Sequence, residues 1–292
     1  NFGALVNRAG RYTSVDTVIG LIMILAVLEA TRRTYGILLP SLVTIALLYG
    51  HFGYLLPGIF RHSGYSWPRL IASVTTYLYG IFGTVLDVSA TYIVLFMIFG
   101  GLLEASGAGE FFIKVAIALG GKTRSGAAQA AVIGSGLVGS INGSAVANVS
   151  STGVLTIPMM KKVGYRPHVA GAIEAAASTG GQIMPPIMGA VAFLMAEFTQ
   201  IPYLTIVTVA TGPIILYYIT LMAFIHFEAK KHNIGQMKDH HIPSARTVCS
   251  EGWHFFVAIM VIIVIMAFGY SPGMSALGGI ITLIVIHSIK SR

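Results

Sequence analysis

The chain has 292 residues, of which 55% are hydrophobic and only 10% are charged, whereas a soluble domain carries about 25% charged residues. This composition predicts a chain that lies largely in lipid, and its single cysteine excludes a disulfide framework and a multi-cysteine metal site. The formal net charge of +8 does not indicate a nucleic-acid partner, because the basic residues cluster at the ends of apolar runs, where membrane orientation accounts for them.

Apolar runs long enough for membrane helices recur along the chain. A helix needs about 20 mostly apolar residues to cross about 30 Å of hydrocarbon, and shorter runs are accommodated by tilt or by burial against protein. We therefore expect an all-α membrane protein, a multi-span helical bundle, with spans at 17–31, 37–59, 89–103, 203–227, 253–270 and 274–289. Two further stretches, 125–160 and 167–200, do not fit a simple span.

Placing successive loops on alternate sides of the membrane separates the basic residues. One side collects most of them, at 32–33, 114–124, 161–166, 230–246 and the C-terminal end, whereas the other side has Arg8, Arg11, Arg61 and Arg69. Cytoplasmic loops carry the excess of lysine and arginine, so the first side is predicted to be cytoplasmic. The stretch 125–160 must then begin and end on that same side.

The uncharged stretch 125–160 is too short for two complete spans and a turn, which would need more than about 40 residues. We therefore expect a re-entrant hairpin of two helices that each cross half of the membrane, with its tip near 140–144. Non-helical backbone at that depth is tolerated only where it packs in protein or lines a watery cavity. The tip is therefore a candidate site.

The hairpin contains a G-x-G-x-x-G pattern at 134–139. Such a pattern indicates dinucleotide binding when it joins a strand to a helix and an acidic residue follows about 20 positions later. No acid follows before Glu174, and the surrounding chain has no alternating strands. Close packing of small residues between membrane helices is the other explanation, and it accounts for 127–135. It accounts poorly for the polar side chains in 140–148.

A helix break is expected inside 167–200. The segment 178–186, STGGQIMPP, places two glycines and two prolines between apolar pieces; glycine relaxes the backbone and proline removes a hydrogen-bond donor. The helix ends would then lie inside the membrane, with exposed amides partly positive and exposed carbonyls partly negative. Transporters use such ends to bind anionic substrate groups and sodium ions. The tip and the break together predict a site for a small ion or solute.

Other polar residues in the sequence are also candidates for chemistry. Glu174 lies one turn before the break, and an acid inside a membrane is a functional candidate by default. We expect it to be either a coupling acid or, equally, a structural acid near the membrane interface, about two turns from Arg166. The histidines at 232, 240 and 241 have no cysteine or carboxylate at the spacing of a metal site. We therefore expect them to be solvated loop histidines and not metal ligands. No G-x-S-x-G or H-E-x-x-H motif is present, and we do not expect an enzyme.

Two long motifs carry a family resemblance. The segments GSINGSAVANVSSTGVLTIPMMKKVGY (139–165) and VAGAIEAAASTGGQIMPPIMGAVAFLMAEF (169–198) resemble the membrane permease of tripartite ATP-independent periplasmic (TRAP) transporters. More specifically, they resemble the fused small-plus-large subunit form of the TAXI branch. The segments 29–58 and 80–112 fit the same family, so the similarity covers nearly the whole chain.

The resemblance implies a sodium-driven importer of small organic anions, usually carboxylates, in the cytoplasmic (inner) membrane of a bacterium or archaeon. A separate soluble binding protein is expected to deliver the substrate, and no cofactor is expected apart from Na⁺ as the coupling ion. The family works as an elevator, in which a transport domain with hairpins and broken helices slides against a scaffold.

The resemblance also implies a domain organisation. Residues 1–88 are expected to be small-subunit-like and linking helices, and 89–292 the first of two inverted repeats of the large subunit. This repeat comprises an amphipathic arm at 107–122, the hairpin at 125–160, the broken helix at 167–200 and scaffold helices at 203–292. A second hairpin and its broken helix are not in the sequence, so we expect the chain to be part of a longer permease.

By the same resemblance, one sodium site combines the hairpin tip with the residues before the break. Its expected members are Ser140, Asn142, Gly143, Ser144, Ser178, Thr179, Gly180 and Gly181. Backbone carbonyls and hydroxyl oxygens are the hard ligands that a small cation prefers. Asn148 and Gln182 are expected to face the substrate. Asn142 departs from the serine expected in many relatives, although its amide oxygen is still able to coordinate a cation.

Two other classes of protein remain as alternatives. A channel, or a carrier that uses protons or another ion and works without a binding protein, also fits the spans and the tip. An intramembrane enzyme would need an acid, base or nucleophile matched to Glu174, and the sequence offers no such partner. The choice between sodium and protons as the coupling ion stays open at this point.

Overall fold

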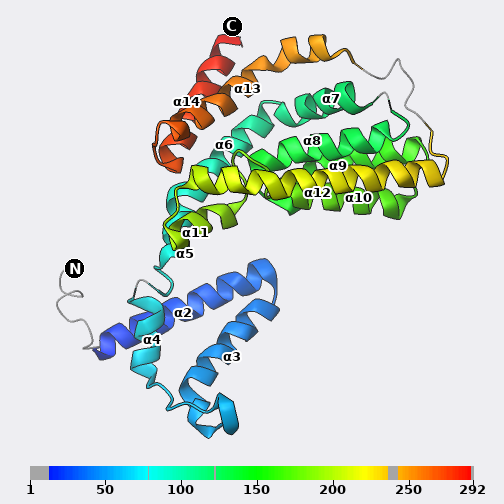
Figure 1. Ribbon diagram of the computed structural model, residues 1–292. Helices are drawn as coiled ribbons and strands as arrows, with labels where there is room; N and C mark the ends of the chain where they lie inside the picture. The colour runs from blue at the N-terminus through cyan, green and yellow to red at the C-terminus, as the bar shows by residue number, and fades with distance from the viewer. Residues whose placement is uncertain (1–12, 78, 122, 236–242, 291–292) are drawn as a thin grey trace. The chain divides into compact units, whose positions relative to one another are not determined.

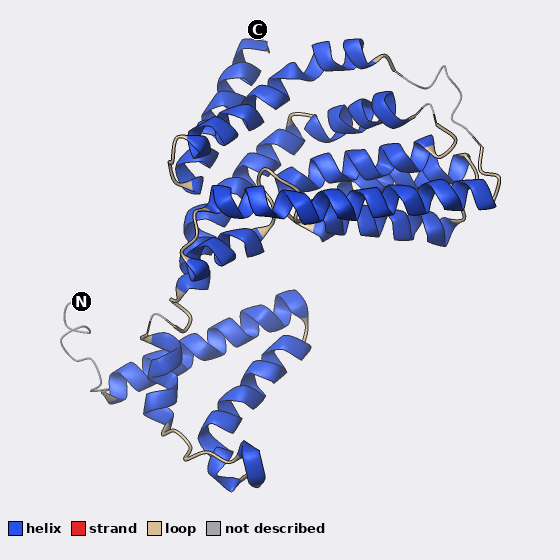
Figure 2. Ribbon diagram, viewed as in Figure 1, coloured by secondary structure: helices blue, strands red, loops and turns tan. Residues whose placement is uncertain are grey.

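The computed structural model describes residues 13–77, 79–121, 123–235 and 243–290. Within these ranges every regular element is helical, and Figure 2 shows helices joined by loops. The predicted all-α class is therefore confirmed. The basic residues Arg8 and Arg11 and the histidines His240 and His241 lie outside the described residues.

Six helices in the described part of the chain are long and apolar enough to cross a membrane. They are Ser14–Tyr35, Leu38–Leu55, Thr84–Ala105, Tyr203–Lys231, Ala245–Ala267 and Pro272–Ile289. Each overlaps one of the six predicted spans, so the multi-span bundle is confirmed. Much of their apolar surface is exposed on the chain itself, as expected for side chains that face lipid.

Residues 1–87 form the first of two compact units. Its helices are α2 (Ser14–Tyr35), α3 (Leu38–Phe52), the short η1 (Gly53–Leu55) and η2 (Gly58–Phe60), and α4 (Trp67–Thr75). α2 begins with a capping box, in which Thr13 Oγ1 accepts a hydrogen bond from the Asp16 amide and the Asp16 carboxylate accepts one from the Thr13 amide. α4 packs on both α2 and α3.

Residues 88–292 form the second unit. Its elements are η3 (Ser89–Ile93), α6 (Val94–Ala105), α7 (Ala108–Gly120), α8 (Gly126–Asn142), α9 (Ala145–Lys162), α10 (Pro167–Gly181), α11 (Ala190–Thr199), α12 (Tyr203–Lys231), α13 (Ala245–Ala267) and α14 (Pro272–Lys290), and α5 (Thr84–Val88) leads into them. Figure 1 shows α8, α9, α10 and α12 side by side, with α7 along α8. The assignment of the two units to a small-subunit-like region and a first repeat stays a prediction.

α8 and α9 form a helical hairpin. Gly143 ends α8 in the left-handed conformation, with φ of 63°, and Ser144 caps α9 by accepting a hydrogen bond from the Ala147 amide. The helices have 17 and 18 residues, about 26 Å each at 1.5 Å per residue. They are therefore longer than the half-membrane helices expected, although the chain reverses within the expected tip.

α10 and α11 form a broken helix. α10 ends at Gly181, residues 182–189 are not helical, and α11 begins at Ala190. Pro185 and Pro186 lack amide hydrogens, so they cannot continue the hydrogen-bond ladder of α10. The Gly189 amide donates to the Gln182 carbonyl at 2.6 Å, which closes the non-helical segment into a loop. The break thus begins within the segment that the glycines and prolines indicated.

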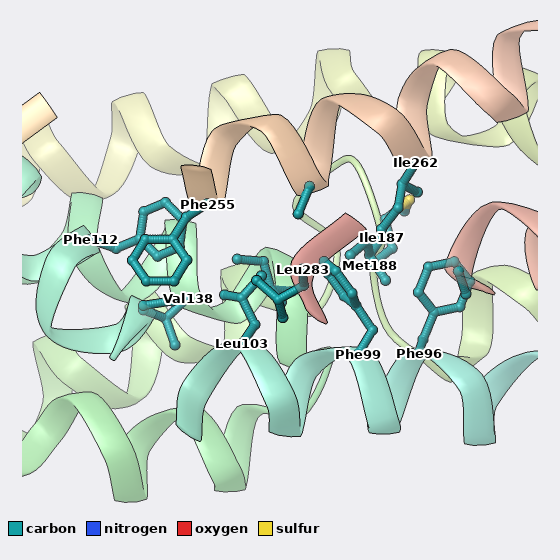
Figure 3. Close-up of a cluster of buried hydrophobic side chains, with 14 of the residues drawn as sticks. Phe96, Phe99, Leu103, Phe112, Val138, Ile187, Met188, Phe255, Ile262 and Leu283 are labelled. Carbon is teal, nitrogen blue, oxygen red and sulfur yellow. The ribbon is translucent and has the colours of Figure 1, made fainter. Parts of the chain in front are cut away.

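An apolar cluster holds this loop inside the second unit. Figure 3 shows Ile187 and Met188 of the loop among side chains from α6, α7, α8, α13 and α14. Phe99 of α6 lies in the same cluster and is 0% exposed. The predicted arm at 107–122 is α7, which buries Phe112 in this cluster and packs on α8 and α13. The break is therefore fixed by the packing of the whole unit.

We predict that Phe99→Ala lowers stability by about 3–5 kcal/mol, because removal of a fully buried ring leaves a cavity. Phe227→Ala is the matched control, since Phe227 is 67% exposed on α12. Thermal unfolding of the detergent-solubilised protein measures the difference. Equal midpoints for the two variants would contradict the packing described for this cluster.

Candidate functional site

The hairpin tip lies against the helix break, backbone to backbone. A Cβ atom on Gly143 would lie 2.6 Å from the carbonyl oxygen of Met188, and one on Gly189 would lie 2.8 Å from the carbonyl oxygen of Gly143. Contacts under 3.0 Å are not tolerated by real Cβ atoms. Gly143 also has a positive φ, which residues with a side chain rarely adopt. Both positions therefore require glycine.

A second close contact joins α8 to the last residue of α10. A Cβ atom on Gly139 would lie 2.7 Å from the Cα of Gly181 and 2.7 Å from Nδ2 of Asn148. Small residues allow membrane helices to approach at this distance. The structure thus brings the tip, the end of α10 and the first turns of α9 together.

The predicted sodium ligands occupy these elements, and their side chains bond locally. Ser140 Oγ donates to the Leu137 carbonyl at 2.8 Å, and Thr179 Oγ1 donates to the Ala175 carbonyl at 2.8 Å. Ser144 Oγ accepts from the Ala147 amide, and Asn142 Oδ1 accepts from the Ser144 amide at 3.2 Å. Each of these oxygens keeps a lone pair for another partner. Thr179 is exposed, whereas Ser140 is buried.

The other predicted members divide between the tip and the interior. Gly180 and Gly181 are buried at the end of α10, and Gln182 is exposed at the start of the break. Ser178 is fully buried and turns away from the tip, since its hydroxyl bonds to Ser135 Oγ at 2.9 Å and to Glu174. The contact of Gly139, just before the tip, with Gly181 of α10 is made by backbone atoms.

Asn148 is fully buried, with one polar atom that lacks a partner. Its Nδ2 donates to the Ser135 carbonyl at 2.7 Å and to Ser135 Oγ at 3.0 Å. If the Asn148 amide were flipped, its oxygen would face the Ser135 carbonyl oxygen, and neither atom is a donor. The carbonyl therefore fixes the orientation of the Asn148 amide. Asn148 Oδ1 has no hydrogen-bond partner, and neither does Asn142 Nδ2 at the tip. A buried amide without a partner is costly, which makes both atoms candidates for ligand contact.

Glu174 is 0% exposed and is surrounded by hydroxyl groups. Its Oε1 accepts from Thr152 Oγ1 at 2.5 Å, and its Oε2 accepts from Thr156 Oγ1 at 2.6 Å. Ser178 Oγ donates to Oε1 at 3.3 Å. Arg166, which the sequence offered as a neighbour, instead pairs with Glu228 at 3.2 Å. Glu174 is therefore part of a buried polar network.

Half of this network was predicted as functional from the sequence. Asn148, Glu174 and Ser178 were expected to be functional, whereas Ser135, Thr152 and Thr156 were not. One signal was visible, because Asn148, Thr152 and Thr156 are spaced four apart and so share a face of α9, as Glu174 and Ser178 share a face of α10. Pairing those two faces required the structure.

Tyrosines of α12 donate hydrogen bonds to backbone carbonyls of α10 and of the break. Tyr217 donates to the Ala176 carbonyl at 2.7 Å and Tyr218 to the Ala177 carbonyl at 3.1 Å. Tyr203 donates to the carbonyl of Ile187 in the break. The last turn of α10 and the loop after it are thus attached to one helix.

A cavity of about 190 Å³ opens beside the network. It is lined by Glu104 at the end of α6, by Glu110 and its neighbours at the start of α7, and by Ser151 and Thr152 of α9. Lys114 pairs with Glu110 at 2.9 Å, and this hydrogen bond raises the pKa of Lys114. In the described ranges no three histidine, cysteine or acidic side chains cluster as a metal site would require.

We predict that Gly139→Ala separates α8 from α10, since its methyl group would overlap the Gly181 backbone, and overpacking typically costs about 1–3 kcal/mol. Gly101→Ala is the control, because a Cβ there has no atom within 4 Å. The midpoint of thermal unfolding should fall for Gly139→Ala and stay unchanged for Gly101→Ala. A Gly139→Ala variant as stable as wild type would refute the contact.

Similarity to known proteins covers most of the chain. Residues 22–292 match the family model of the tripartite ATP-independent periplasmic transporter, DctM component. The chain is 28% identical over 278 residues to the isethionate TRAP transporter permease protein DctMQ of Oleidesulfovibrio alaskensis, covering 92% of this chain and 41% of that relative. It is 24% identical over 163 residues to the 2,3-diketo-L-gulonate TRAP transporter large permease protein YiaN of Escherichia coli, covering 56% of this chain and 36% of that one.

A third relative, a putative TRAP transporter large permease protein of Haemophilus influenzae, is 27% identical over 119 residues, covering 41% of this chain and 28% of its own length. The chain therefore spans less than half the length of these relatives. Its apolar helices and its relatives make it a multi-pass protein of the inner membrane. The TAXI branch and the fused form stay predictions. With the family model matched over nearly its whole length, the chain belongs to the DctM family of TRAP transporter permeases.

Proposed function

We propose that this chain builds one half of the transport site of a sodium-coupled permease that imports small organic anions. A soluble binding protein delivers the substrate, and sodium moving inward drives its uptake. The observation that carries the proposal is the contact of the hairpin tip at Gly143 with the helix break at Met188 and Gly189. At this contact two non-helical segments of backbone meet inside the helical bundle, and in a permease such backbone is expected to pack in protein or to line a watery cavity.

Four helix ends converge on this contact and supply both signs of partial charge. α8 and α10 end here, and the carbonyls at their C-terminal ends carry partial negative charge that suits a sodium ion. α9 and α11 begin here, and their first amides carry partial positive charge that suits a carboxylate. The arrangement therefore supports a cation and an anion bound side by side.

The sodium ion is proposed to bind the oxygens of the tip and of the end of α10. The tip contributes Ser140, Asn142, Gly143 and Ser144, and α10 contributes the residues 178–181. Asn148 and Gln182 are proposed to face the substrate, and the unpartnered Asn148 Oδ1 supports this for Asn148. The names of two relatives support the substrate class, since isethionate and 2,3-diketo-L-gulonate are both small organic anions.

Uptake by the complete permease in liposomes, with its binding protein, tests the coupling. We expect accumulation of a labelled organic anion when sodium is outside, and loss of accumulation when choline replaces sodium, because choline does not fit a site of hard oxygen ligands. Unchanged uptake in choline would remove the sodium claim. Flux that needs no binding protein and never accumulates the anion against its concentration gradient would support a channel instead.

Single hydroxyl deletions test the proposed ligands. Ser144→Ala and Thr179→Ala should raise the sodium concentration for half-maximal uptake by about tenfold, equivalent to roughly 1.4 kcal/mol for a lost ligand. Ser150→Ala is the control, because Ser150 is exposed on α9 and bonds to the Val146 carbonyl of its own helix. If both variants show the sodium dependence of the control, the ligand assignment is wrong.

A further inference from the structure

The last turn of α10 tightens before the helix ends. In a regular α-helix the carbonyl of Ser178 would accept the amide of Gln182. The Gln182 amide donates instead to the Thr179 carbonyl at 3.2 Å, and the Ile183 amide donates to the Gly180 carbonyl at 3.1 Å. This pattern is that of a 3₁₀ turn, and the α-helical ladder passes over the Ser178 carbonyl. The carbonyls proposed to bind sodium therefore begin where the helix changes its hydrogen bonding.

Two tyrosines of α12 bond to the two carbonyls just before this change. Tyr217 donates to the Ala176 carbonyl at 2.7 Å, and Tyr218 donates to the Ala177 carbonyl at 3.1 Å. A carbonyl oxygen has two lone pairs, so it accepts a tyrosine hydroxyl in addition to a helix amide. The peptide unit that carries the Ala177 carbonyl also carries the Ser178 amide. The tyrosines thus hold the peptide units from which the sodium-site carbonyls continue.

Glycines make room for both tyrosine rings. A Cβ atom on Gly180 would lie 2.6 Å from Cε1 of Tyr217 and 3.1 Å from Cζ of Tyr218, and one on Gly136 of α8 would lie 2.8 Å from the Tyr218 hydroxyl oxygen. The rings therefore lie against the backbone of α8 and α10, closer than a Cβ atom would allow without movement of a ring. Tyr217 and Tyr218 also meet edge to face, with ring centroids 5.7 Å apart, so each limits the movement of the other.

Two consecutive glycines leave the last turn of α10 in need of external support. Gly180 and Gly181 have no side chains that could hold the turn, and glycine has more conformational freedom to lose than any other residue. Thr179 Oγ1 donates to the Ala175 carbonyl at 2.8 Å. With the two tyrosines, three successive carbonyls at 175–177 each accept a hydroxyl. Hydroxyl groups therefore fix the backbone where the glycines do not.

The same helix, α12, also holds the far side of the break. The Tyr203 hydroxyl donates to the Ile187 carbonyl in the loop, and the Tyr203 ring stacks on Phe193 of α11 with centroids 4.5 Å apart. α12 therefore contacts both halves of the broken helix, and Tyr217 and Tyr218 are its contacts on the half that carries the proposed ligands.

We propose that Tyr217 and Tyr218 are positioning residues for the sodium site, which hold the last turn of α10 so that the carbonyls of 178–181 keep a fixed spacing. Their hydroxyls are used on the carbonyls of α10, so they act through the backbone and not as ligands. A small cation binds several oxygens at once, and a set of oxygens that is already in place loses less entropy when the ion arrives. The effect on sodium rests on the proposed function, whereas the ordering of the turn does not.

Hydrogen exchange of the complete permease in sodium-free buffer, measured by mass spectrometry, tests the ordering of the turn. A double variant, Tyr217→Phe with Tyr218→Phe, keeps both rings and removes only the hydroxyls. The amides of 178–182 should exchange about tenfold faster than in wild type, because two hydrogen bonds that hold the turn are lost. The amides of 167–173 should be unchanged. Tyr270→Phe is the matched control, because Tyr270 is 60% exposed and lies between α13 and α14.

Equal exchange at 178–182 in the double variant and in the control would overturn the proposal. This measurement needs no ion and no transport, so it separates from a failure of the sodium test.

A sodium titration of uptake distinguishes positioning from a merely structural role. In the double variant the sodium concentration for half-maximal uptake should rise about tenfold, whereas the maximal rate at saturating sodium should stay close to that of wild type, because every ligand remains. A lower maximal rate with an unchanged half-maximal sodium concentration would overturn the positioning role. Wild-type uptake that does not depend on sodium would instead overturn the proposed function, and with it the effect of the tyrosines on sodium.

Discussion

Backbone contact between glycines is the constraint on which this site depends. Gly139 meets Gly181, and Gly143 meets the loop before Gly189, at distances that leave no room for a Cβ atom. Irregular backbone inside a membrane protein must be covered by protein or face a watery space. These contacts cover most of it and leave the converging helix ends in one place. The side chains nearby add polar atoms to this candidate site, whereas the glycines allow the backbone segments to come together.

Above this contact, the interior between α8, α9 and α10 combines very small residues with hydroxyl groups. The alanines in 127–131 are buried and bring α8 close to its neighbours. The space is thereby narrow enough for Ser135 to bond to Ser178 and for Thr152 to bond to Glu174 across helices. Hydroxyls satisfy a buried acid without adding a charge, and they change direction at little cost.

The sequence predicted the elements of the fold better than the contacts between them. The spans, the tip and the break follow from local features: apolar length, a charge-free stretch, and the glycines and prolines of 178–186. The helices of the hairpin are longer than the sequence predicted, because residue count alone gives neither the tilt of a helix nor how much of it lies outside the lipid. The network around Glu174 was not predicted, because hydrogen bonds between separate helices depend on their rotation about their axes, which no local pattern gives.

α12 has 29 residues and α10 has 15, and hydrogen bonds and an ion pair join the two helices at two distant places. At one end Glu228 holds Arg166, and at the other the tyrosines hold the last turn of α10 and the loop beyond it. Because α12 is attached to α10 at two distant points, we expect the two helices to move together as one rigid pair in any rearrangement of this unit.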